Sequence, residues 1–236
     1  MNSRRRVTSN VMPYFPTFVL LRICAVIVCI YGFSIPAFPQ ASINKLCGPL
    51  VEPNSPKPTA YFPQNAFNDS DNFTIDWYSK HLLAMTEPSM LTRTDCAVES
   101  YRFVWLRTFH QPIAVRVWRA NGRHYLVVKE LSGQGGYEPG RIVVTRLRSL
   151  AEAEWINLKR QLSQISFWNL PTEQSTVKNP DGSLTVGVDG AEWIIEGLQN
   201  GKYHVTSRWS AKGKYRKVCL YLLRLSNLRV KRTEIY

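Results

Sequence analysis

Four charged side chains in the last third of the sequence could act together in acid–base chemistry. Glu192 and Glu196 lie on one segment rich in strand-forming residues, and His204 and Arg208 lie on the next, after Gln199-Asn200-Gly201. A three-residue type I turn with a glycine bulge would set Glu196 opposite His204 and Glu192 opposite Arg208 on one sheet face. There Glu196 would orient the imidazole and Arg208 would hold an anion, as in a small hydrolase-like or ligand-binding surface.

A structural interpretation of the same four residues is favoured over the catalytic one. Cross-strand pairs of opposite charge, worth about 0.2–1 kcal/mol each, fix the register of a half-exposed sheet. The sequence supplies no Gly-x-Ser-x-Gly motif and no catalytic cysteine context that would provide a nucleophile. Either interpretation predicts that Glu196 raises the pKa of His204, because a nearby carboxylate favours the imidazolium.

We expect no metal and no cofactor. The histidines are scattered and form no His-x-x-x-His pair, and no two cysteines form a C-x-x-C pair. The glycines of Gly133-Gln-Gly-Gly136 lack the Lys-Ser/Thr of a phosphate-binding loop and do not open a helix. They are better explained as a structural loop.

The N-terminus has the pattern of an export signal. Three arginines, Arg4 to Arg6, precede an apolar stretch at 18–33, and prolines follow it. Arg22 interrupts this stretch, and its unbroken part, residues 23–33, has the length of a signal-peptide core rather than of a full membrane span, so we predict that residues 1–41 are a signal peptide. If Arg22 lies at the cytoplasmic interface, the same segment would instead be an uncleaved anchor. The protein is therefore expected in the periplasm or cell envelope, or else as a single-pass inner-membrane protein.

Residues 42–73 are predicted to be a proline-rich tether and residues 74–236 a single domain. In an oxidising compartment Cys47 and Cys96 could form a disulfide, and the spacing leaves open whether they do. Cys219 lies in an apolar run, where a free cysteine behaves as a small hydrophobic residue.

The predicted domain alternates strands and helices in an α+β pattern. Alternating or β-branched runs predict strands at 101–109, 113–120, 123–131, 141–147, 184–188, 191–198 and 202–209. Helical periodicity predicts a short helix at 74–85, one at 149–165 that begins with a Ser149/Glu152 capping box, and one at 214–230. We therefore expect an antiparallel sheet built from β-hairpins with two helices packed on one face, in the order β-β-β-β-α-β-β-β-α.

The charge of the chain is concentrated near its C-terminus. The sequence carries 30 basic and 17 acidic residues, and residues 205–236 hold nine of the basic and one of the acidic ones. Export argues against nucleic acid as a partner. The basic residues are expected to form the solvated face of the last helix, and weak contact with anionic membrane lipids is the alternative.

Several segments resemble a group of bacterial proteins known mainly as hypothetical exported proteins of unassigned function. The resemblance is carried by residues 99–103, 115–118, 131–137, 167–171, 189–196, 201–205 and 208–210. It implies a bacterial exported protein and transfers no mechanism.

Two classes of function follow from the sequence. The first is a non-enzymatic exported domain that binds an unknown protein or an envelope component. The second is an exported hydrolase-like enzyme that uses Glu196, His204 and Arg208. A concave pocket around these side chains would favour the enzyme, and a flat or covered face would favour the binding domain.

Overall fold

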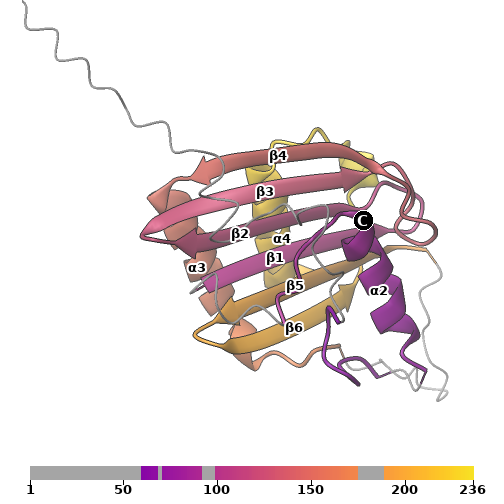
Figure 1. Cartoon of the computed structure of the whole chain (residues 1–236), viewed down its shortest axis with the longest axis horizontal. Coiled ribbons are helices and arrows are strands. Elements are labelled where there is room, and N and C mark those ends of the chain that lie inside the picture. Colours follow the sequence, from indigo (N-terminus) through magenta and orange to yellow (C-terminus); the bar gives the residue numbers. More distant parts are fainter. Residues whose placement is uncertain (1–59, 69–70, 92–98, 175–188) are drawn as a thin grey trace, which may run out of the picture. The chain divides into compact units, whose positions relative to one another are not determined.

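A computed structural model of the chain describes residues 60–68, 71–91, 99–174 and 189–236 (Figure 1). Six strands form one antiparallel sheet with the order β4-β3-β2-β1-β5-β6. They are β1 (Glu99–Arg107), β2 (Ile113–Ala120), β3 (Arg123–Leu131), β4 (Ile142–Leu150), β5 (Ala191–Gln199) and β6 (Lys202–Trp209). The α-helices are α2 (Phe73–Ala84), α3 (Glu152–Gln164) and α4 (Gly213–Leu225). The predicted α+β class with an antiparallel sheet is confirmed.

Two Asn-Gly turns fix the register of the hairpins. At the β2–β3 turn Asn121 and Gly122 have φ values of 50° and 71°, and at the β5–β6 turn Asn200 and Gly201 have 50° and 75°. Positive φ at both central residues is the requirement of a two-residue type I′ turn. The first turn is the one predicted. The second was predicted to contain three residues, and this part of the prediction is wrong.

One face of the sheet packs against α3 and α4, which Figure 1 shows on the same side of it. Every second residue of β1 and β5 points into this aromatic core, because side chains alternate along a strand. Its aromatic members are Tyr101, Phe103, Trp105, Trp155, Phe167, Trp193, Tyr215 and Tyr221. The prediction of two helices on one face is confirmed.

The opposite face of the sheet carries α2 and residues 60–68. Tyr78 and Leu82 of α2 pack there with Val104, Ile194 and Val205 from the central strands and β6. The short helix predicted at 74–85 thus forms, and it lies across the sheet from α3 and α4.

Two helix boundaries differ from those predicted. The predicted Ser149/Glu152 capping box is wrong because β4 continues to Leu150, and the Ala151 N–H donates instead to Glu154 Oε2 at 2.8 Å. The helix α4 ends at Leu225 rather than near residue 230. Asn227, with φ 53°, adopts the left-handed conformation that commonly terminates helices.

Other predictions fall outside the described residues: the leader at 1–41, most of the tether, the Cys47–Cys96 pair and the strand at 184–188. Cys219 is a buried free thiol, as its apolar surroundings predicted. No helix in the described part of the chain is long and apolar enough to span a membrane.

Candidate functional site

The structure divides the four predicted site residues between the two faces of the sheet. With a two-residue turn, Glu196 is opposite Val205, and His204 is opposite Gly197. Glu192 and Glu196 therefore face α2, whereas His204 and Arg208 face α3 and α4. The predicted cross-strand pairs are wrong, since a shift of one residue moves a side chain to the other face.

His204 lies against aromatic rings rather than beside a carboxylate. Its ring meets Phe167 edge-on at a centroid distance of 5.1 Å and lies 6.2 Å from Trp168. Burial here lowers the pKa of His204 from its usual 6.5. The predicted rise in this pKa is therefore wrong.

We expect NMR titration of the folded protein to give His204 a pKa below 6.5. Because the folded pKa is lower than the unfolded one, this histidine contributes stability fully above about pH 6.5 and loses it as pH falls toward the folded value. A titration midpoint above 6.5 would contradict the assignment of its surroundings.

Arg208 holds a neighbouring loop in place. Its buried guanidinium donates to the carbonyl oxygens of Pro171 and Thr172, each at 2.9 Å, and lies 5.3 Å from the centroid of the Tyr215 ring. These contacts fasten residues 171–172 to β6, so Arg208 acts within the fold and is not presented to an anion.

Glu192 joins α2 to the sheet. It accepts a hydrogen bond of 2.6 Å from Ser207 Oγ, which lies 3.1 Å from the hydroxyl of Tyr78 on α2. Burial raises the pKa of Glu192 above its usual value. Glu192 is therefore engaged in hydrogen bonding within the fold.

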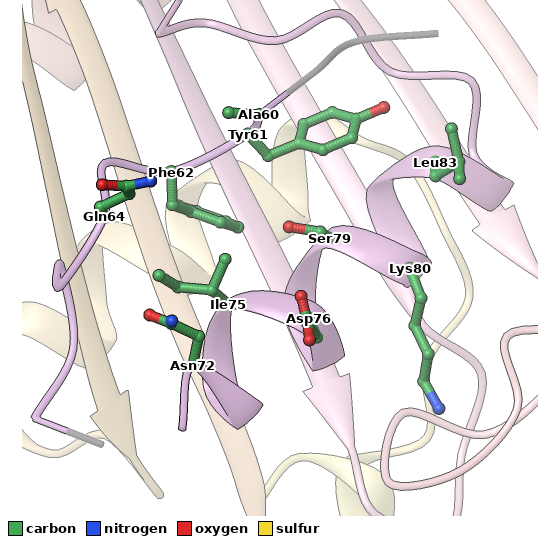
Figure 2. Close-up of a pocket in the computed structure, with 10 residues that line it drawn as sticks. All are labelled: Ala60, Tyr61, Phe62, Gln64, Asn72, Ile75, Asp76, Ser79, Lys80 and Leu83. Atoms are coloured by element: carbon green, nitrogen blue, oxygen red, sulfur yellow. The ribbon is translucent and has the colours of Figure 1, made fainter. Parts of the chain in front are cut away.

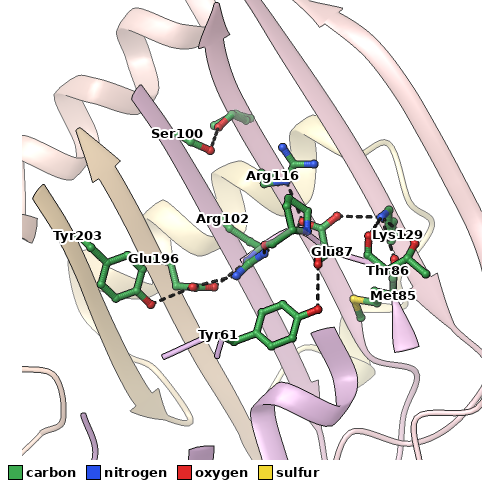
Figure 3. Close-up of polar contacts among 12 residues, drawn as sticks. Tyr61, Met85, Thr86, Glu87, Ser100, Arg102, Arg116, Lys129, Glu196 and Tyr203 are labelled. Atoms are coloured by element: carbon green, nitrogen blue, oxygen red, sulfur yellow. Dashed lines mark hydrogen bonds and ion pairs between the residues drawn. The ribbon is translucent and has the colours of Figure 1, made fainter. Parts of the chain in front are cut away.

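Glu196 belongs to a buried ion cluster formed by Glu87, Arg102, Arg116, Lys129 and Glu196 (Figure 3). Arg102 donates to it in a bidentate manner, with Nε–Oε2 at 2.7 Å and Nη2–Oε1 at 2.8 Å. The hydroxyl of Tyr203 donates to Glu196 Oε1 at 2.9 Å. This geometry satisfies both oxygens of the carboxylate.

Glu87 lies at the centre of the buried ion cluster. Its carboxylate is 2.8 Å from Arg116 Nε, 3.1 Å from Lys129 Nζ and 3.3 Å from Arg102 Nη1. Burial alone would raise the pKa of Glu87, but the three cations outweigh it and hold this pKa well below its usual value. The carboxylate is therefore ionised throughout the neutral range.

The buried ion cluster is closed to solvent. The exposed fraction of each of its five side chains is 4% or less. Tyr61 lies over it and donates to the Glu87 carbonyl oxygen at 2.8 Å, and burial raises the pKa of Tyr61 to about 12. Through Glu87 the cluster links the segment that follows α2 to the sheet, and within the described residues its charges are covered.

A cavity of about 490 Å³ lies between residues 60–64 and α2 (Figure 2). Aromatic side chains of Tyr61 and Phe62 approach it from one side, and Asp76, Ser79 and Lys80 from the helix. Lys80 is already paired with Glu138 at 3.3 Å. The cavity could admit a small polar molecule, and its two ionisable lining residues other than tyrosine, Asp76 and Lys80, lie one turn apart on α2.

A second groove, of about 540 Å³, lies between α3 and α4. Its charged lining residues are Arg160, Lys214 and Lys217, all cations. The amides of Asn157, Gln161 and Gln164, with Ile165 and Val218, complete the lining. Such a set of donors, without a carboxylate among the lining residues, is suited to an anion.

The groove belongs to a surface that we call the basic helix layer, residues 151–165 and 211–236. This layer holds ten basic and three acidic residues, whereas the other described residues hold twelve basic and ten acidic ones. The three acidic residues each contact a side chain outside the layer: Glu152 with His124, Glu154 with Arg148 and Glu234 with Arg107. They therefore do little to neutralise the lysines of the groove.

The sequence matches no model of a known protein family, and a search of curated proteins finds no significant relative. The described residues contain no group of three or more His, Cys, Asp or Glu side chains placed to hold a metal. The geometry and charge of the described surface are therefore the basis for any functional proposal.

Proposed function

We propose that this chain is a non-catalytic, exported domain of the cell envelope that binds anionic membrane lipids through the basic helix layer. The observation that carries the proposal is the groove between α3 and α4, whose charged lining residues are Arg160, Lys214 and Lys217. The apolar leader at 1–41 supports export by its sequence pattern.

The chemistry of the groove fits lipid headgroups. Lipid phosphates accept hydrogen bonds from ammonium, guanidinium and amide donors, all of which line it. Each lysine or arginine near an anionic membrane surface contributes about 1 kcal/mol to binding. Ile156, which is 56% exposed, lies one turn before Arg160 on α3 and could enter the headgroup region beside it.

The geometry gives less support to the hydrolase alternative. Glu196 lies on the opposite sheet face from His204 and Arg208, and each of the three is engaged in contacts of the fold. A reacting group would need a base and an anion-binding side chain around one open site. The binding interpretation requires no such site.

Vesicle sedimentation with the full chain tests this proposal. We expect binding to vesicles that contain phosphatidylglycerol, little binding to pure phosphatidylcholine, and an affinity that falls as salt is raised, because salt screens exposed charges. Contact through Arg4 to Arg6 of the leader would also respond to lipid charge and salt, so loss of binding in Lys214→Glu/Lys217→Glu assigns the contact to the basic helix layer. Equal binding to both vesicles would contradict the proposal, as would binding that salt leaves unchanged.

A further inference from the structure

The two edge strands of the sheet, β4 and β6 (Figure 1), differ in whether another segment of the chain bonds to their outer side. At the β6 edge the Ser207 N–H donates to the Thr172 carbonyl at 2.6 Å, and Arg208 binds the same short segment. Residues 171–172 thus cover part of this edge. No comparable backbone hydrogen bond from another described segment reaches the outer side of β4.

The register of the sheet identifies which β4 groups point outward. The Leu131 N–H donates to Pro112 O at 3.0 Å, so odd-numbered residues of β3 direct their backbone groups toward β2 and even-numbered ones toward β4. Val128 is opposite Arg146, which therefore bonds inward. The backbone groups of the odd-numbered residues 143–149 consequently point away from the sheet.

The β4 edge has few of the usual protections against pairing: two arginines, and a shift of its register with β3 at Glu130/Leu131. Its first half, residues 142–145, is β-branched throughout, and Ile142 and Val143 are 36% and 52% exposed. The strand contains neither proline nor glycine. Its two arginines are turned toward the helix side, where Arg146 donates to Asn227 O at 3.0 Å and Arg148 binds Glu154. A long exposed edge of this kind is a template for another strand.

We infer that a second copy of the chain pairs with β4 in antiparallel orientation. The strand is self-complementary, because its first half is β-branched and uncharged and its second half carries the arginines. A two-fold axis at Thr145 would place Val144 opposite the partner copy's Arg146, and Ile142 opposite its Arg148. Like charges then do not face each other across the axis.

This pairing would place both helix layers on the same side of one continuous sheet. An axis perpendicular to the sheet keeps each face on its own side, so the two basic helix layers would face one membrane together. This consequence rests on the proposed function, whereas the pairing itself does not. Edge pairing alone buries less than a standard interface of about 1,600 Å², so we expect a concentration-dependent dimer that a membrane surface would favour.

Analytical ultracentrifugation of the full chain without lipid tests the pairing separately from membrane binding. The wild type and Thr145→Val should shift toward dimer as concentration rises. Thr145→Pro should remain monomeric with an unchanged circular dichroism spectrum, because proline removes an outward N–H and suits an edge strand.

Thr145→Lys keeps the backbone N–H, so it tests the pairing even if the proline variant does not fold. It should also weaken the dimer at least tenfold, because it sets like charges directly opposite each other. A wild type that stays monomeric at every concentration would overturn the inference. So would a folded Thr145→Pro or Thr145→Lys protein that dimerises as the wild type does.

Discussion

Glu87→Gln should lower the free energy of unfolding by about 3–5 kcal/mol, because removing one partner of a buried ion pair leaves uncompensated charge in the core. Glu87 faces Arg102, Arg116 and Lys129 within the closed cluster, and glutamine keeps its size while removing its charge. Chemical denaturation at neutral pH measures the change.

The pH dependence of stability should change with the same substitution. The pKa of Glu87 is held below its usual value of 4.5, so the stability that it contributes is full above that pH and is lost as pH falls toward the folded value. The wild type should therefore become less stable in acid below about pH 4.5. In Glu87→Gln this component of the slope should be missing.

Glu138→Gln is the matched control. Glu138 also pairs with a cation, Lys80, but its side chain is 89% exposed. Exposed pairs contribute about 0–1 kcal/mol, so this variant should be nearly as stable as the wild type. Similar losses of stability in Glu87→Gln and Glu138→Gln would show that the buried ion cluster does not fasten the segment after α2 to the sheet.

The residues of the two Asn-Gly turns explain why the register of the β2–β3 hairpin was predicted correctly and that of the β5–β6 hairpin was not. The Asn121-Gly122 hairpin was predicted correctly because the dipeptide alone specifies a type I′ turn. At Asn200-Gly201 the same dipeptide follows Gln199, and including that residue in the turn moved the register by one. Side chains alternate between the two faces of a strand, so an error of one residue places His204 and Arg208 on the wrong face of the sheet.

The buried ion cluster could not be predicted because its members meet only in the folded chain. Arg102, Arg116 and Lys129 come from three strands, and Glu87 comes from a segment without periodicity after α2. The available signal was the presence of single charges at inward positions of otherwise apolar strands, which requires a buried partner. The sequence does not identify that partner.

The candidate binding surface was predictable in part. The excess of basic residues after residue 205 is visible in the sequence and led to the alternative of membrane contact. The contribution of Arg160 was not, since it depends on how α3 packs beside α4. The charge composition therefore indicated that α4 is basic, and only the folded structure shows that α3 and α4 form a groove.

Reversal of two charges in the groove tests the central claim. Lys214→Glu/Lys217→Glu should reduce the affinity for phosphatidylglycerol vesicles by at least about 2 kcal/mol, or roughly thirtyfold, because each cation contributes about 1 kcal/mol. Both lysines are exposed, so the fold should be retained.

The most direct measurement compares this variant with Lys80→Glu/Arg123→Glu, which changes the net charge equally but lies outside the basic helix layer. Vesicle sedimentation of the two folded variants at the same salt concentration should show the large loss for the groove variant and less than about a threefold loss for the control. Equal losses would mean that net charge alone attracts the protein to the membrane, and would contradict a binding surface between α3 and α4.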